Sequence, residues 1–275
     1  MRKSCSEPTR RFRVAAVGAI LLLAGCGPLS LSEESQLGHS FQQEMRKELP
    51  ILHDRVVTDY VREMGRGILK AAGPQPFDYT FQVVVDENVN AFAGPAGHIY
   101  IHTETILKAR NASELAGVIA HEIGHVVERH VAENYNRQRN TQIGQQVLVA
   151  GAGIAGGGGM ANLANFGSGL AAVAYLNTFG REAEMESDAF AVETLPKAGW
   201  DPAGLVTFFQ LLQEDSGDGG PSFLSSHPAT SERIRATSEA LEVVDRPPGV
   251  RIDDGGRLQI IQRRILLLTR QSSRY

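Results

Sequence analysis

The chain of 275 residues has the length of one ordinary domain with short appendages, and 21% of its residues are charged. The formal net charge is −4; residues 1–25 hold five basic residues and one acid, so the remainder carries −8, from 22 basic against 30 acidic residues. An acidic body argues against nucleic acid as a partner, because phosphate backbones are bound by clustered Lys and Arg.

The N-terminus has the pattern of an export signal. A basic start is followed by the 12-residue apolar run "VAAVGAILLLAG" (14–25), which is short for a permanent membrane helix. The end of this run, Leu23-Ala24-Gly25-Cys26, resembles a bacterial lipobox. We therefore expect a lipoprotein signal peptide over residues 1–25, with cleavage before Cys26 and lipid attached to it. The alternatives are a plain signal peptide or an uncleaved anchor, with Cys26 incidental.

The use of cysteine agrees with lipidation. Of the two cysteines, Cys5 lies in the segment expected to be removed, so Cys26 remains alone and no internal disulfide can form. A free thiol is a liability in an exported protein, and acylation removes it. Gly27, rather than Asp, follows Cys26. By analogy with lipoprotein sorting, we expect a periplasmic protein anchored by lipid to the outer membrane.

The first part of the body is predicted as a tether and a helix. Residues 26–50 are polar and predict a lipid-anchored tether that ends in a short helix. Residues 54–73 place apolar side chains at helical spacing, and Gly73-Pro74 ends the pattern. These apolar positions are Val57, Tyr60, Val61, Met64 and Ile68.

Two strands are predicted next. Residues 78–86 are rich in β-branched and aromatic side chains, and residues 97–103 alternate, with "ENVNAFAGPA" between them. Asn111 lies three residues before Glu114, which is typical of a capped helix start. We expect this helix to run past His130 to about residue 137.

Residues 140–180 contain no charged side chain, and the segment 151–169 holds eight glycines. A membrane span is one interpretation, but glycine costs about 1 kcal/mol in a helix and Gln and Asn interrupt the run. Two small-residue helices packed closely together, joined by a glycine link, are the better prediction.

Three further helices are predicted in the last third of the chain. They start near Arg181, at Asp201-Pro202 and at His227-Pro228. The globular domain is then expected over residues 51–245. Residues 246–275 form a C-terminal tail with no clear pattern.

The stretch "HEIGH" (121–125) contains candidate metal-binding and catalytic residues. His121 and His125 are four residues apart, so on a helix their rings leave one face a turn apart and can share one tetrahedral zinc. Glu122 can take the proton of a metal-bound water, and Gly124 leaves room beside the metal. The alternative is that this pattern occurs by chance on an exposed helix. The neighbouring residues in the sequence are apolar, however, which predicts a buried helix. Burying two histidines and a glutamate costs free energy unless they have partners or bind a metal.

His130 tests a three-histidine version of this site. In that pattern the third histidine follows six residues after the second, beyond a glycine that breaks the helix. Here Val131 occupies the sixth position and Glu128 stands in place of the glycine. We therefore expect the helix to continue and His130 to point away from the pair, as an exposed or partly satisfied residue.

A second helix must then supply the third ligand. In residues 181–195, Glu184 and Asp188 lie one turn apart within an apolar stripe, whereas Glu182 and Glu186 fall on a polar stripe. Glu184 would complete a His2Glu site with water in the fourth position. Asp188 would accept the outer N–H of a ligand histidine. The alternative is an exposed acidic helix.

Together these motifs resemble the CAAX prenyl protease, HtpX and Oma-type zinc peptidases. The sequence "HEIGH" is followed by "EMESD" (184–188), and two other segments, 90–106 and 225–233, are similar to flanking motifs of that family. The likeness covers roughly residues 50–235, and with the lipobox it is nearest to the small periplasmic lipoprotein metalloproteases. Ser187 departs from the alanine common in the family.

The resemblance implies an α+β, mostly helical, zincin-like (gluzincin) metallopeptidase domain with a small β-sheet beside the HExxH helix. It implies one Zn²⁺ per chain, with Glu184 as the third ligand. It also implies an edge strand to which substrate backbone adds. That strand would hold Asn90, Ala91, Phe92 and Ala93.

Two further residues gain roles from the resemblance. His227 would lie near the metal, as a fourth ligand at rest or as an oxyanion stabiliser, although a histidine before proline is often only a cap residue. Arg233 would pair with the acidic site; otherwise it is an exposed charge on a helix.

The implied function is a zinc-dependent endopeptidase acting on periplasmic or outer-membrane proteins in envelope quality control. Its partners would be misfolded or assembling outer-membrane proteins, and lipid would tether it to the membrane. The alternative is a chaperone-like binding factor for outer-membrane protein assembly, with latent proteolysis.

Overall fold

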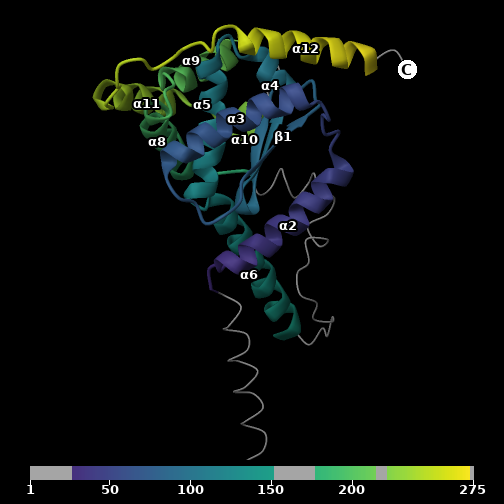
Figure 1. The fold of residues 1–275 in the computed structure, drawn as a ribbon. Coiled ribbons are helices and arrows are strands. Elements are labelled where there is room, and N and C mark those ends of the chain that lie inside the picture. Colours follow the sequence, from purple (N-terminus) through teal and green to yellow (C-terminus); the bar gives the residue numbers. More distant parts are fainter. Residues whose placement is uncertain (1–26, 152–176, 215–221, 273–275) are drawn as a thin grey trace, which may run out of the picture.

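A computed structural model describes residues 27–151, 177–214 and 222–272. The expected signal peptide and Cys26 lie outside these residues, as does nearly all of the glycine-rich segment 151–169. Within the described ranges, no helix combines the length and hydrophobicity needed to cross a bilayer. The predicted α+β, mostly helical class is confirmed, with one small sheet among many helices (Figure 1).

The described sheet has three strands in the order β1-β3-β2. The two predicted strands correspond to β1 (Thr80–Val84) and β3 (His98–His102), which pair in parallel. Strand β2 (Ala91–Gly94) lies between them in the sequence. It pairs antiparallel with β3 and forms one edge of the described sheet. A short 3-10 turn, η1 (Pro95–Gly97), joins β2 to β3.

Helix α5 (Ala112–Val127) is the centre of the domain and carries the HEIGH sequence. Asn111 caps it as predicted, its Oδ1 accepting the Glu114 N–H at 3.0 Å. Nearly every side chain of α5 is buried, because β2 lies against it together with α8 (Arg181–Lys197) and α9 (Ala203–Glu214). The HEIGH residues therefore sit in the interior of the domain.

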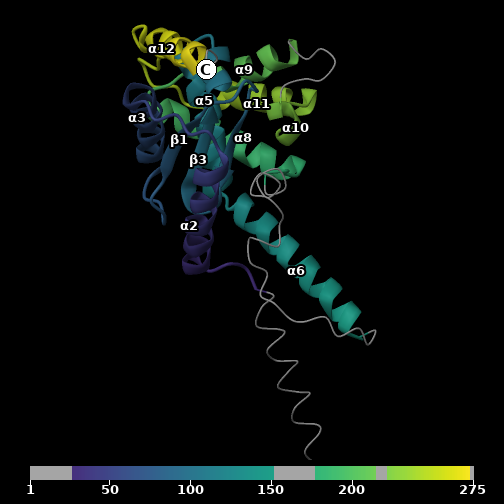
Figure 2. The ribbon, with the colours of Figure 1, turned by 90° about the vertical axis from the view of Figure 1, so that its right-hand side faces the viewer.

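The prediction that this helix continues past His130 is wrong. Helix α5 ends at Val127, and a new helix, α6 (His130–Gly151), leaves the body at a different angle (Figure 2). At the junction Arg129 has φ of 62°, a left-handed conformation that costs about 1–2 kcal/mol. Its guanidinium donates to Glu34 Oε2 at 2.6 Å and to the Leu29 carbonyl at 2.8 Å. These contacts hold the turn in place.

The expected short helix before residue 50 is in fact long. Helix α2 (Leu31–Glu48) starts with a capping box between Ser30 and Glu33. Its Phe41 and Met45 are fully buried in the main core. This segment is therefore packed against the domain over most of its length.

The remaining helices complete the shell. Helix α3 (Arg55–Ala72) buries the predicted apolar positions, and α12 (Arg257–Ser272) packs against it, so the C-terminal segment with no clear pattern contains a helix. The predicted start at His227-Pro228 is wrong, because helix α11 (Ser231–Val243) begins only after its Thr230 cap. Two short helices are α4 (Thr103–Lys108) and α10 (Ser222–Ser226).

Helices α5 and α9 meet at backbone contact. A Cβ on Gly204 would lie 2.3 Å from the Ser113 carbonyl carbon and oxygen. Gly204→Ala should lower the free energy of unfolding by about 1–3 kcal/mol, because the helices must move apart. Gly67→Ala on α3 is the matched control, since no atom of the described residues lies within 4 Å of the added Cβ; it should raise the free energy of unfolding by about 0.5–1 kcal/mol. Urea unfolding of both variants checks this, and equal effects would contradict it.

Candidate metal centre

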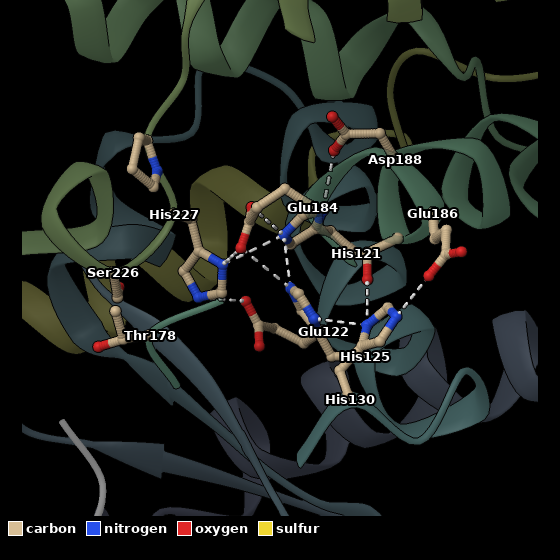
Figure 3. A network of polar contacts seen from close by, with 12 residues as sticks. His121, Glu122, His125, His130, Thr178, Glu184, Glu186, Asp188, Ser226 and His227 are labelled. Atoms are coloured by element: carbon tan, nitrogen blue, oxygen red, sulfur yellow. Dashed lines mark hydrogen bonds and ion pairs between the residues drawn. The ribbon is translucent and has the colours of Figure 1, made fainter. Parts of the chain in front are cut away.

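Four buried side chains converge at one point beside α5. His121 and His125 come from α5, Glu184 from α8, and His227 from the link between α10 and α11 (Figure 3). One nitrogen or oxygen atom of each lies within 4.8 Å of the others. Local spacing predicts three of them, and the family resemblance implies His227 near the metal; the fold brings all four together.

The distances between these atoms suit a tetrahedral cation. The Nε2 atoms of His121 and His125 are 3.1 Å apart. His227 Nδ1 lies 3.3 Å from His121 Nε2 and 3.0 Å from Glu184 Oε1. Donors about 2.0 Å from a tetrahedral ion are about 3.3 Å from one another. Imidazole and carboxylate donors at this separation match the chemistry of a zinc site.

A buried ion-pair network lies behind His121. Its Nδ1 is 2.9 Å from Asp188 Oδ1, so Asp188 has the outer position expected from the sequence. Arg233 donates to both Asp188 oxygens, at 2.9 and 2.8 Å, and its Nη1 lies 2.6 Å from Glu184 Oε2. Arg233 is only 1% exposed, so it is no surface charge. It holds two carboxylates of α8 from α11.

On the other side, His125 contacts His130. Their Nδ1 atoms are 3.0 Å apart, and His130 Nε2 lies 2.8 Å from Glu186 Oε2. The expectation that His130 is exposed and points away is wrong: it is 4% exposed, because the turn at Arg129 directs the chain back toward His125. His130 is nevertheless outside the cluster of four.

Glu122 is the unusual acid of the site. Both of its carboxylate oxygens are buried and have no hydrogen-bond partner among the described residues. Its Oε1 is 3.6 Å from His227 Nε2, which also lacks such a partner. Burial raises the pKa of Glu122. A partnerless buried carboxyl beside a cluster of donors is suited to exchanging a proton with a bound water.

The electrostatics of the cluster follow from its partners. Burial alone would lower the pKa of His121, but Asp188 and Glu184 outweigh it and raise that pKa to about 9. Burial lowers the pKa of His125, which favours the neutral imidazole. Burial opposes ionisation of Glu184, yet His227 and His121 hold its pKa below the usual range. A metal bound here would displace the proton of His121.

The expected substrate strand overlaps β2. Ala91, Phe92 and Ala93 lie in this strand, and all three are buried. Asn90 precedes it, and its backbone N–H and C=O are both taken by the hydroxyl of Thr105, at 2.8 and 2.6 Å. Any added strand would therefore pair with β2 itself rather than with Asn90.

Sequence reasoning missed two aromatic or imidazole neighbours of the site. Phe179 stacks on His125 with centroids 3.8 Å apart, and His130 binds the same ring from behind. His130 had a signal in the sequence, its closeness to His125, whereas Phe179 had none.

Comparison with known families agrees with this geometry. Residues 56–241 match the model of peptidase family M48, so the chain belongs to this family. The resemblance to CAAX-protease, HtpX and Oma-type peptidases is thereby confirmed, and the small sheet beside the HExxH helix is that of a zincin-like fold.

Several curated relatives are proteases by name, and some of these names specify a metalloprotease or metalloendopeptidase. The putative beta-barrel assembly-enhancing protease of Vibrio cholerae is 30% identical over 77% of this chain and 44% of its own length. The mitochondrial metalloendopeptidase OMA1 of Arabidopsis thaliana is 29% identical over 76% of this chain and 41% of its own. Metalloprotease LoiP of Escherichia coli K12 is 30% identical over 58% of this chain and 61% of its own. The chain thus spans less than half of the first two relatives.

Proposed function

We propose that the chain is a zinc-dependent endopeptidase, with His121, His125 and Glu184 as ligands of one Zn²⁺ and Glu122 as the catalytic base. The observation that carries this proposal is the buried Glu122 carboxyl, which has no hydrogen-bond partner in the described part of the chain and lies beside the cluster of four donor atoms. Zinc, when bound, lowers the pKa of its water towards about 7 and polarises the scissile carbonyl.

Three residues, Glu122, Asp188 and Arg233, have separate roles in the proposed reaction. Glu122 takes a proton from the attacking water and delivers it to the leaving amine as the C–N bond breaks. Burial raises the pKa of this carboxyl, which makes it a stronger proton acceptor than a solvated glutamate. Asp188 accepts the outer N–H of His121 and so directs Nε2 toward the metal. Arg233 keeps the carboxylates of Asp188 and Glu184 in place.

A substrate backbone would add to β2 as an extra strand. The strand lies against α5, which carries His121, His125 and Glu122. An extended peptide at this edge of the sheet would therefore bring a peptide bond to the cluster.

The proposed substrates are misfolded or assembling outer-membrane proteins, in the periplasm, with the chain anchored to the outer membrane by lipid on Cys26. The lipobox-like Leu23-Ala24-Gly25-Cys26 supports the anchor, and the names of the assembly-enhancing relatives support the substrate class. Outer-membrane protein fragments should accumulate in cells with active protein and be absent from cells without it. Identical fragment patterns would remove this substrate class.

A chaperone-like role in outer-membrane protein assembly is the second candidate, because the relatives are named for enhancing assembly. The two roles differ in their need for Glu122. A Glu122→Gln chain that fully restores assembly in cells lacking the gene favours binding. A chain that fails to restore it favours cleavage.

Removal of the metal should abolish peptidase activity. A strong chelator should strip the cluster of three or four donors, and added zinc should restore cleavage of an unfolded protein substrate, whereas added magnesium should not, because imidazole donors disfavour it. Activity that survives complete chelation, verified by metal analysis, contradicts a zinc mechanism.

His227→Ala should raise peptidase activity. His227 Nδ1 lies within the donor cluster, 3.3 Å from His121 Nε2, where it would occupy the fourth position that the water needs. Three ligands remain in the variant, so zinc should be retained. Initial rates at equal zinc content provide the measurement. A loss of activity would instead assign His227 to oxyanion stabilisation, and an unchanged rate would exclude both roles.

A further inference from the structure

His130 is a buried histidine that the proposed mechanism does not use. It is the first residue of α6 and is 4% exposed, with its ring between His125 and Glu186 (Figure 3). A histidine needs partners for its polar atoms when it is buried. Both ring nitrogens of His130 have one, at 3.0 Å on the His125 side and 2.8 Å on the Glu186 side.

The position of His130 depends on an unfavourable backbone conformation in the turn before it. The reversal between α5 and α6 requires the left-handed conformation of Arg129. The buried carboxylate of Glu34, on α2, binds the Arg129 guanidinium through two contacts of 3.1 and 2.6 Å. A helix that continued straight would carry His130 away from His125.

The direction of each hydrogen bond follows from the metal site. His125 Nε2 faces the other donors, 3.1 Å from His121 Nε2, so it must be free of hydrogen to bind a metal. His125 Nδ1 then carries the proton and donates it to His130 Nδ1. His130 must therefore hold its own proton on Nε2, where Glu186 Oε2 accepts it. Each of these two hydrogen bonds, from His125 to His130 and from His130 to Glu186, then has one donor and one acceptor.

We propose that His130, held by Glu186, is a positioning residue that fixes the tautomer and ring orientation of His125 for metal binding. The inference rests on the proposed metal site. Asp188 does the same for His121 through a carboxylate, which is the usual outer partner of a ligand histidine. On the His125 side a histidine replaces the carboxylate and relays the bond to Glu186, whose side chain is 53% exposed.

Two other residues, Ser187 and Phe179, lie next to His130 or His125, and their contacts differ from the proposed hydrogen bond. Ser187 Oγ is 3.4 Å from His130 Nδ1, a longer and weaker contact than that of His125. Phe179 stacks on the His125 ring and supplies packing without a hydrogen bond. A change that keeps ring volume at residue 130 but removes the acceptor therefore isolates the proposed contact.

The test is zinc affinity, measured on the full chain by competition with a chelating dye. His130→Phe should weaken zinc binding by about 10–100-fold. His130→Gln, which keeps an acceptor, should recover most of this loss. Ser187→Ala should leave the affinity unchanged. His102→Phe is the matched control, because His102, at the end of β3, is also a buried histidine, 7% exposed. Its Nδ1 lies 3.1 Å from the Asn88 carbonyl oxygen and contacts no residue of the cluster.

Equal zinc affinity of His130→Phe and His102→Phe would overturn the inference and leave the proposed function intact, whereas a wild-type chain that binds no zinc would overturn both. Should His130→Phe fail to fold, the surface change Glu186→Ala tests the inference. It should weaken zinc binding, and unchanged affinity would contradict the hydrogen-bond series from His125 through His130 to Glu186.

Nitrogen NMR of zinc-loaded wild-type protein gives a second readout. It should find the His130 proton on Nε2; a proton on Nδ1 contradicts the assigned bond directions.

Discussion

Glu122→Gln should lower the rate of peptide cleavage by about 10²–10⁴-fold, because the amide cannot accept the proton of the attacking water. The zinc content should stay at the wild-type level, since Glu122 has no contact at hydrogen-bond distance to the donors of the cluster. The fold should also survive: the two side chains have the same shape, and no described hydrogen bond is lost.

The measurement is the initial rate on an unfolded protein substrate at equal zinc content. Glu193→Gln on α8 is a suitable control, because Glu193 is exposed on the outer face of that helix. A zinc-loaded Glu122→Gln protein that cleaves at the wild-type rate would remove Glu122 from the mechanism.

Arg233→Met should lower the free energy of unfolding by about 3–5 kcal/mol, because it removes one partner of a buried ion-pair network. The guanidinium is 1% exposed and binds Asp188 at 2.8 Å and Glu184 at 2.6 Å, so its loss leaves two buried carboxylates without their cation. It would also remove the contact over the Phe209 ring, 4.8 Å away. In the metal-free chain the two acids then repel each other; bound zinc should recover part of the loss.

Urea unfolding with and without zinc measures both effects. Arg235→Met provides the control on the same helix, because Arg235 pairs with Glu239 at the surface, where such pairs contribute about 0–1 kcal/mol. If Arg233→Met and Arg235→Met unfold at the same urea concentration, the buried network does not stabilise the fold as argued.

The local geometry of the site was predictable because a helix has a fixed period. His121 and His125 had to share a face once α5 formed, and the same holds for Glu184 and Asp188 on α8. Composition likewise predicted β1, which is rich in β-branched and aromatic residues, and alternation of side chains predicted β3. Each of these features depends on residues within one turn or one strand of each other.

The errors concern contacts between distant segments. The break after Val127 depends on Arg129 and Glu34, which are 95 residues apart, and no local pattern records such a pair. Glu128 was a poor indicator of helix continuation, because a non-glycine residue, Arg129, takes the left-handed position once it is anchored. The burial of His130 follows from that same break.

The sequence by itself determined the donor types, their pairing on two helices and the acid beside them, because helical periodicity acts over a few residues. Only the tertiary structure decided that α8 faces α5, that the His227 link reaches the same point, and that His130 turns back onto His125. The physical reason is that these placements arise from core packing and buried ion pairs between segments far apart in the chain, whose energies depend on the whole fold.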